Sequence, residues 1–271
     1  MERVEKEILL QVTNASLVFG DKVILRPINI AIKDIVGHGQ VVGLLGPSGI
    51  GKTQFFRVLS GFQKPTTGEV TIVDGLQKPI PVRPGLVGVV AQSYPLFRHR
   101  TVQQNLVMAA KARGLDGKAA LEQSMEFLKR FQLQDHLQKF PAQLSGGQRQ
   151  RIAIAQQLLC SEHYLLMDEP FSGLDPVMLD EVCRMIQEVA DINELNTIIV
   201  ITHDIRAAVK VADTLWIMGR DRDEKGNIIP GAYVKYFYDL VERGLAWHPN
   251  VSDTPEFNTF AHEIKDLFRS L

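Results

Sequence analysis

A glycine-rich segment near residue 50 has the residue types and spacing that bind phosphate. The run Gly46-Pro47-Ser48-Gly49-Ile50-Gly51-Lys52-Thr53 matches the P-loop pattern of a glycine, four residues and then Gly-Lys-Ser/Thr. Glycines let the backbone curl so that N–H groups point at phosphate oxygens, and a following helix start adds partial positive charge. The segment therefore predicts nucleotide binding. Lys52 would reach the β- and γ-phosphates, and the Thr53 hydroxyl would ligate Mg²⁺.

Two adjacent carboxylates complete such a site. Tyr164–Met167 reads as an apolar strand, and Asp168 and Glu169 follow it directly. A carboxylate at the end of a core strand beside a P-loop can hold Mg²⁺ through water, which suits Asp168. Glu169 would then face the γ-phosphate, where it could orient and deprotonate the attacking water. Adjacent acids after a strand are also common in the first turn of a helix, so only the combination with the P-loop predicts hydrolysis.

A third polar segment predicts a second phosphate cradle. Ser145-Gly146-Gly147-Gln148 follows Leu144 and opens the predicted helix Gln148–Leu159. A helix start of this kind binds anions through its free N–H groups. One nucleotide does not need two such cradles in one subunit, so the economical explanation is that the second serves a nucleotide held by another copy.

At Leu144–Gln148 the sequence matches the signature of the ATP-binding cassette (ABC) ATPases. The chain resembles this family from about Ile8 to Gly219, with the family's motifs in order. The resemblance implies that ATP and Mg²⁺ are bound between two copies, each clamped by one copy's P-loop and the other's signature segment.

The resemblance also implies roles for residues that are weak signals alone. Phe19 sits where the family stacks an aromatic ring on adenine, and Gln92 matches the glutamine that touches Mg²⁺ and senses the transport partner. Ser172-Gly173-Leu174-Asp175 matches the loop that crosses the dimer interface. His203 matches the histidine that contacts the γ-phosphate. Taken singly, Phe19 could be an ordinary core residue, and a lone histidine at a strand end is usually structural.

Some positions depart from the family pattern. Ile50 replaces a small residue inside the P-loop, and Gln54 replaces the frequent serine or threonine after Thr53. The loop uses backbone groups at residue 50, so ATP binding by the loop and by Gln54 is still expected. Gln156 and Gln157 stand where the family often has an arginine and a small residue.

The elements that must position these residues follow from hydrophobic patterning. Strand, helix and strand with short links predict an α/β fold with a parallel sheet. Apolar strand-like runs and helix-like runs alternate along the chain: strands at Ile8–Val12, Val23–Leu25, Ile28–Ile32, Gln40–Leu45, Val87–Ala91, Tyr164–Met167 and Thr197–Thr202, and helices at Lys52–Ser60 and Pro176–Ala190. The interpretation is a P-loop NTPase (RecA-like) core with a parallel central sheet, an N-terminal antiparallel β-subdomain and an inserted helical subdomain.

The domain boundaries predicted are an ATPase domain over residues 1–220, with the helical subdomain at about 93–160, and a C-terminal extension over 221–271. Thr254 can cap a last helix with Pro255 at its first position. That helix carries one apolar stripe, formed by Phe257, Phe260, Ile264, Leu267, Phe268 and Leu271.

Composition limits the partners. The net charge of −1 disfavours a global attraction to nucleic acid, and two cysteines make no disulfide framework, which fits a reduced cytosolic setting. No run approaches the roughly 18 apolar residues that a membrane span needs. A role at a membrane would therefore require a partner that holds the chain there.

Transport is the leading functional hypothesis. Pro141 and the stretch from Tyr94-Pro95-Leu96-Phe97 to Asn105 resemble ATPase subunits of bacterial importers, in which a groove beside the glutamine loop receives helices of a permease. The segment Gly244-Leu245-Ala246-Trp247 is more loosely similar to nitrate, sulfonate and bicarbonate uptake ATPases. Expected partners are a second copy or another ABC ATPase, integral membrane permease subunits and, for an importer, a solute-binding protein. The expected location is the cytoplasmic face of the membrane.

Two other functional classes fit the sequence less well. A soluble ABC ATPase acting on DNA or ribosomes usually carries a long coiled-coil insertion or two cassettes, and this sequence has neither. A structural platform that binds ATP without turnover would have a degraded catalytic set, whereas Lys52, Asp168, Glu169 and His203 are all present.

Overall fold

The computed structural model describes residues 5–35, 37–73, 78–161, 163–248, 250–269 and 271, with side chains from residue 7 onward. The first part of the chain is an antiparallel sheet. Strands β1 (Glu5–Phe19) and β2 (Lys22–Ile35) form a long hairpin that turns at Gly20 and Asp21. Strands β4 (Thr67–Val73) and β5 (Pro79–Pro81) continue the sheet in the order β2-β1-β4-β5. The predicted antiparallel β-subdomain is confirmed.

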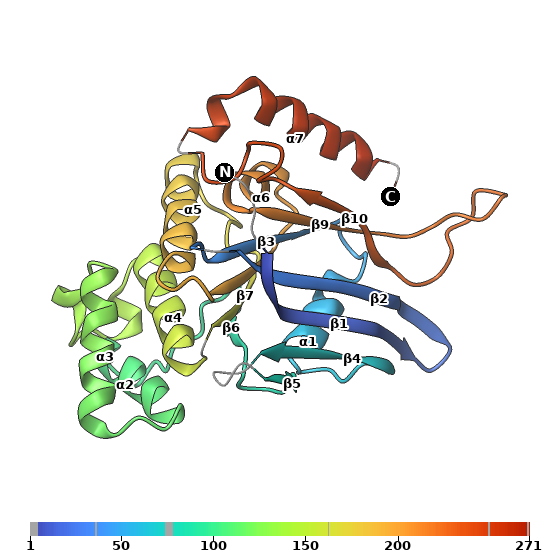
Figure 1. Cartoon of the computed structure of the whole chain (residues 1–271). Coiled ribbons are helices and arrows are strands. Elements are labelled where there is room, and N and C mark those ends of the chain that lie inside the picture. The colour runs from blue at the N-terminus through green and yellow to red at the C-terminus, as the bar shows by residue number, and fades with distance from the viewer. Residues whose placement is uncertain (1–4, 36, 74–77, 162, 249, 270) are drawn as a thin grey trace.

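A second, six-stranded sheet forms the centre of the molecule (Figure 1). Its order is β10-β9-β3-β8-β7-β6, and in that order the strands span Tyr233–Asp239, Thr214–Gly219, Gln40–Leu45, Thr197–Ile201, Tyr164–Asp168 and Gly88–Val90. All neighbours run parallel except β10, which pairs antiparallel with β9. The predicted parallel sheet is therefore confirmed, with one antiparallel strand added at its edge. The parallel strands end at one edge, where ligands bind in such sheets.

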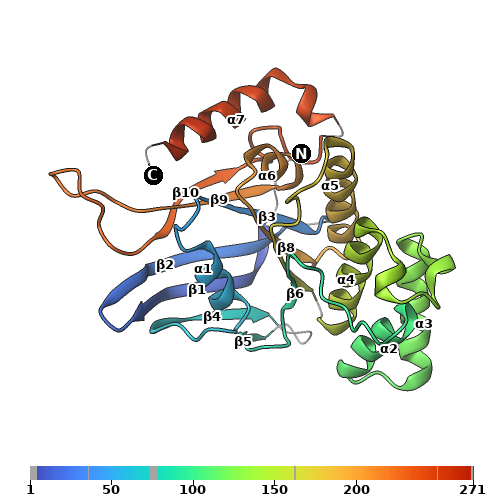
Figure 2. The ribbon, with the colours of Figure 1, turned by 180° about the vertical axis from the view of Figure 1, so that it is seen from behind.

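Helices cover both faces of the central sheet. Along β3, Val41 and Leu45 enter one apolar core and Val42 and Leu44 the other, which explains the unbroken apolar run of that strand. One core includes α1 (Lys52–Leu59) and the antiparallel sheet, and Figure 2 shows α1 in front of these strands. The other core includes α5 (Pro176–Ala190), α6 (Ile205–Val211) and α7 (Pro255–Phe268).

A group of helices projects from the side of the central sheet (Figure 1). It contains α2 (Val102–Ala112), α3 (Gly117–Arg130) and α4 (Gly146–Cys160). Two short 3-10 helices, η1 (Gln134–His136) and η2 (Pro141–Gln143), connect α3 to α4. Within the described residues, no helix combines the length and the apolar composition needed to cross a bilayer.

The sequence pattern predicted separate strands at Val23–Leu25 and Ile28–Ile32, with a break at Pro27, and this prediction was wrong. β2 runs through Pro27 because the β1–β2 register shifts between the pairs Ala15–Ile28 and Leu17–Leu25, so Pro27 lies in an irregularity. β2 is also an edge strand of its sheet, where a missing N–H is tolerated.

The predicted last helix is confirmed. The Thr254 hydroxyl accepts a hydrogen bond from the backbone N–H of Phe257 (3.2 Å), and Phe257, Phe260 and Ile264 are buried. A short 3-10 helix, η3 (Val251–Asp253), precedes it. β10 joins the central sheet and α7 shares its core, so these two elements of the predicted extension are packed on the ATPase core, and the boundary at 220 stays a prediction.

Candidate functional site

A cavity of about 540 Å³ lies at the carboxyl edge of the central sheet. It brings together the greater part of the P-loop, the predicted glutamine and both acids from widely separated parts of the sequence. Its lining residues are Val23, Ile24, Ser48, Gly49, Ile50, Gly51, Lys52, Thr53, Gln54, Gln92, Asp168, Glu169, Ile201 and Arg220. The predicted residues Gly46 and Pro47 are not among the lining residues, but their carbonyls accept hydrogen bonds from Lys52, which is one of them.

The P-loop leads from β3 into α1 with a curled backbone. Gly49 and Gly51 have φ of 76° and 119°, which side-chain-bearing residues rarely adopt. A Cβ at Gly46 would lie 3.1 Å from both the Met218 carbonyl oxygen and the Ile50 side chain. Gly51 is the N-cap residue, and within the described residues no side chain caps this helix. The loop therefore presents a helix start that a ligand can satisfy.

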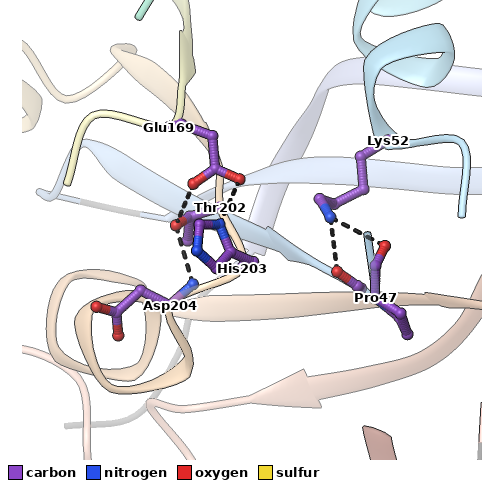
Figure 3. Close-up of polar contacts among 7 residues, drawn as sticks. Pro47, Lys52, Glu169, Thr202, His203 and Asp204 are labelled. Carbon is purple, nitrogen blue, oxygen red and sulfur yellow. Dashed lines mark hydrogen bonds and ion pairs between the residues drawn. The ribbon is translucent and has the colours of Figure 1, made fainter. Parts of the chain in front are cut away.

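Lys52 folds back onto the loop. Its ammonium donates hydrogen bonds to the carbonyls of Gly46 (2.6 Å) and Pro47 (3.2 Å), as Figure 3 shows. Burial lowers the pKa of Lys52, and the nearby Glu169 and Asp168 carboxylates oppose that change. An ammonium has three N–H groups, so one more remains for a ligand in the cavity.

Glu169 is held at both carboxylate oxygens. Oε2 accepts a hydrogen bond from the Thr202 hydroxyl (2.9 Å), and Oε1 lies 2.9 Å from Nδ1 of His203 (Figure 3). The Glu169 backbone has φ of 48° and donates its N–H to Ile201. Strained backbone of this kind persists where surrounding contacts determine it and is concentrated at functional sites. Thr202 in turn accepts a hydrogen bond from the Asp204 N–H (3.1 Å), so the carboxylate is oriented by a partly buried network.

Asp168 has the environment of a cation ligand. Burial raises its pKa, the Glu169 carboxylate raises it further, and Lys52 opposes the change. Two carboxylates beside one ammonium leave excess negative charge that a cation would neutralise. Thr53 and Gln92 add neutral oxygens to the same cavity.

These donors fit Mg²⁺ bound together with a phosphate ligand. Within the described residues there is no group of three or more His, Cys, Asp or Glu side chains that could hold a metal alone. Mg²⁺ is a hard cation that proteins usually hold with one or two carboxylates plus substrate phosphates, rather than in an all-protein cage.

The signature segment lies away from this cavity. The part of the chain that the structure describes places Ser145–Gln148 at the start of α4, and none of its residues lines the P-loop cavity. Ser145 and Gly146 are exposed, and Gly147 lines a separate groove of about 340 Å³ between α4 and α5. The structure of one chain thus keeps its two glycine-rich helix starts apart.

Three other predicted residues also lie outside the cavity lining, and one of them, His203, is joined to it through its contact with Glu169. Asp175 is exposed and caps α5, accepting hydrogen bonds from the N–H groups of Val177 (2.9 Å) and Met178 (3.0 Å). Phe19 ends β1 with 45% of its surface exposed, so it is not a core residue. That exposure removes the core alternative and leaves the ring free to meet a ligand.

Sequence reasoning missed Arg220 and Thr202. Arg220 lines the cavity, and its guanidinium donates a hydrogen bond to the P-loop carbonyl of Gly49 (3.3 Å). The signal was topological: Arg220 follows β9, which pairs with β3, so both strands end at the same place. Thr202 precedes His203 and could have been selected only by knowing that β7 and β8 are neighbours.

A second groove, of about 440 Å³, lies beside the glutamine loop. It is lined by Ser93, Tyr94, Pro95, Leu96, Arg98, Pro141, Ala142 and Arg149. The loop behind it is held by the buried Asn105, which accepts the Phe97 N–H (2.8 Å) and donates to the Thr101 carbonyl (2.9 Å). Tyr94 donates its hydroxyl to the carbonyl of Pro170 (3.2 Å), the residue directly after Glu169. The groove is thus linked to the Glu169 loop by one hydrogen bond.

Known proteins with similar sequences belong to the family that the sequence motifs resemble. The sequence profile of the ABC transporter family matches residues 31–172. The chain is 35% identical over 214 residues to the sulfate/thiosulfate import ATP-binding protein CysA of a Synechocystis strain, covering 79% of this chain and 59% of that protein. It is also 35% identical over 237 residues to the glutamate/aspartate import ATP-binding protein GltL of Escherichia coli, covering 85% of this chain and 93% of that protein.

A solved structure agrees with these relatives. CbiO1 from Clostridium perfringens, described as part of the ABC transporter complex cbiONQ, superposes with a TM-score of 0.72. The two chains are 25% identical, and the match covers 96% of this chain and 100% of cbiO1.

Proposed function

The chain belongs to the ABC transporter family, and on that premise we propose that it binds and hydrolyses ATP to drive import through a membrane permease. One observation carries the proposal: the P-loop, Asp168 and Glu169 line a single cavity large enough for a ligand. The names of CysA and GltL support the direction, since both are import ATP-binding proteins. The chain spans only 59% of CysA but 93% of GltL, so GltL is the closer guide to a whole subunit.

ATP would lie along the P-loop with its phosphates toward the two acids. Loop N–H groups from Gly46 to Thr53 and the start of α1 would bind the β- and γ-phosphates, with Gln54 beside them. The third N–H of Lys52 would meet a phosphate oxygen. The exposed ring of Phe19 would stack on adenine, and the guanidinium of Arg220 would hold the loop at Gly49.

Mg²⁺ would be held by Thr53, Gln92 and Asp168 together with ATP. When bound, it would neutralise phosphate charge and favour the in-line displacement. These residues supply only oxygen atoms, which is the donor set that Mg²⁺ prefers.

Glu169 is the proposed general base. Its carboxylate is already oriented by Thr202, and attack on the γ-phosphate requires a proton acceptor beside the attacking water. His203 would support the γ-phosphate through the exposed side of its ring, while Nδ1 remains on Glu169. Lys52 would stabilise the negative charge that develops on the phosphate oxygens.

Two copies are proposed to complete two sites. The exposed start of α4, with Ser145, Gly146, Gly147 and Gln148, would contact the γ-phosphate bound by a partner copy, and Asp175 would lie at the same interface. ATP would then bridge the copies, and its hydrolysis would let them separate. This gives a switch that a docked partner can follow.

The groove beside the glutamine loop is the proposed permease site. It combines apolar side chains such as Leu96 with the cations Arg98 and Arg149, which suits a short helix carrying a carboxylate. Docking there would hold the chain on the cytoplasmic face of the membrane, alongside any solute-binding protein on the other side. The nitrate, sulfonate and bicarbonate grouping stays a prediction that depends on Gly244–Trp247 alone.

Two measurements test the proposal. The purified protein should release phosphate from Mg-ATP, and the Glu169→Gln variant should bind ATP without releasing phosphate. In cell lysates the chain should sediment with membranes only while its permease is present. Sedimentation with ribosomes or DNA instead would favour the soluble class and overturn the transport role.

A further inference from the structure

A histidine outside the family motifs contacts the signature segment. His136 ends η1, and its Nε2 lies 2.7 Å from the side-chain nitrogen of Gln148. Gln148 is the last residue of Ser145–Gln148, the segment proposed to bind a partner's γ-phosphate. The inference drawn here rests on that proposed function.

The orientation of the Gln148 amide is fixed by the backbone. Its Oε1 accepts the N–H of Ser145 (3.0 Å), while the Gln148 N–H donates to the Ser145 hydroxyl (3.3 Å). This reciprocal arrangement is a capping box. A backbone N–H can only donate, so the oxygen of the amide must face Ser145 and its nitrogen must face His136.

The protonation state of His136 follows from that orientation. The amide nitrogen of Gln148 only donates, so Nε2 of His136 must accept, which requires a neutral ring with its proton on Nδ1. Within the described residues, Nδ1 is buried and has no hydrogen-bond partner. In the part of the chain that the structure describes, the hydrogen bond of the His136 imidazole is therefore the one to Gln148.

The backbone around His136 is itself anchored. The carbonyls of Leu137 and Lys139 accept hydrogen bonds from the N–H groups of Gln103 (3.1 Å) and Val102 (2.9 Å), at the start of α2. The imidazole therefore extends from a fixed segment, and Gln148 is held between it and Ser145.

We propose that His136 is a positioning residue of the signature segment: as a hydrogen-bond acceptor it fixes the Gln148 amide, and so the capping box that shapes Ser145–Gln148 for a partner's ATP. Loss of the acceptor frees the amide to rotate and loosens the capping box. The P-loop of the same chain is untouched, so ATP binding by a single copy stays as it is while association of two copies weakens.

The test uses three substitutions in the Glu169→Gln background, with ATP-dependent association measured by sedimentation velocity at saturating Mg-ATP. His136→Leu removes the acceptor, and we expect about a tenfold higher protein concentration for half-association. His136→Gln restores an acceptor at similar reach and should stay within about twofold of the parent. His99→Leu, an exposed histidine in the same subdomain, is the matched control and should change nothing.

The outcomes distinguish a failure of the proposed function from a failure of the positioning role of His136. If the Glu169→Gln parent does not associate, the proposed function fails before the role of His136 is reached. If the parent associates and His136→Leu associates equally well, the positioning role alone is wrong. The positioning role is also contradicted if His136→Leu and His136→Gln weaken association equally while the ATP affinity of the single chain is unchanged. Association would then not depend on a hydrogen-bond acceptor at residue 136.

Discussion

The molecule contains two glycine-rich helix starts with opposite construction. The start of α1 has glycine at its N-cap, no side-chain cap within the described residues, and a position inside a cavity with two carboxylates. The start of α4 has serine at its N-cap, a complete capping box, and an exposed position away from acids in that cavity. The first holds a ligand by leaving its N–H groups open. The second is preformed by its own side chains and lies outside the cavity that holds the two carboxylates, which is what half of a shared site requires.

The largest expected effect separates chemistry from binding within the α1 site. Glu169→Gln removes the proposed base but keeps the Thr202 and His203 contacts possible, so phosphate release should fall about 10²- to 10⁴-fold while ATP affinity is retained. Phosphate release and fluorescent-nucleotide titration measure the two quantities. The exposed Glu122→Gln is the control. Turnover at the wild-type rate would show that another group is the base.

The second effect breaks the α4 site without touching the α1 site. A Cβ at Gly146 meets no atom within 4 Å, so Gly146→Asp should fold normally while placing a carboxylate where the partner's γ-phosphate is expected. Like-charge repulsion should weaken ATP-dependent association about a hundredfold and leave single-chain ATP affinity unchanged.

Gly117→Asp is the matched control, because Gly117 also opens a helix and has space for a side chain. Its association should equal that of the parent. If Gly146→Asp associates as well as Gly117→Asp does, the start of α4 does not contact ATP.

The third effect weakens the α1 site and leaves the α4 site unchanged. Lys52→Ala removes the ammonium of the P-loop, and loss of a charged hydrogen bond should weaken ATP binding about 10- to 100-fold. Nucleotide titration of the single chain measures it, with exposed Lys64→Ala as the control. Unchanged affinity would mean that Lys52 serves only the loop carbonyls of Gly46 and Pro47.

The smallest effect concerns the base of the nucleotide. Phe19→Ala should weaken ATP binding about threefold to tenfold, the scale of one aromatic stacking contact, and Phe19→Tyr should preserve it. Phe62→Ala removes another exposed phenylalanine and should have no effect. Equal affinity of Phe19→Ala and wild type for ATP would place adenine elsewhere.

The two regions also differ in how far the sequence predicts them. The P-loop and its flanking elements follow from local pattern, because the buried run Gln40–Leu45 and the start of α1 are fixed by neighbours in sequence. Contacts made across the fold do not follow from such patterns. Arg220 reaches the P-loop because β9 pairs with β3, and His136 reaches Gln148 because residues 137–139 are attached to α2.

Tertiary contacts also decide some features that local sequence patterns do not predict. Pro27 is a strand breaker by pattern, yet β2 tolerates it at a register shift on a sheet edge. β10 lies after residue 220, within the predicted extension, and its pairing with β9 makes it the edge strand of the central sheet. By contrast, the start of the last helix was predictable to the residue because Thr254 and Pro255 are a local start signal.

Mixing two inactive variants tests most directly whether the two helix starts are halves of one site. Lys52→Ala lacks a working P-loop and Gly146→Asp lacks a working signature segment, so each alone should hydrolyse little ATP. In a mixed pair, one site combines both defects and the other is intact. In an equal mixture half of the pairs are mixed, and each mixed pair has one intact site of two, so phosphate release should reach about one quarter of the wild-type rate. The measurement uses the assembly in which the wild type is active. A mixture no more active than its components would contradict the shared site.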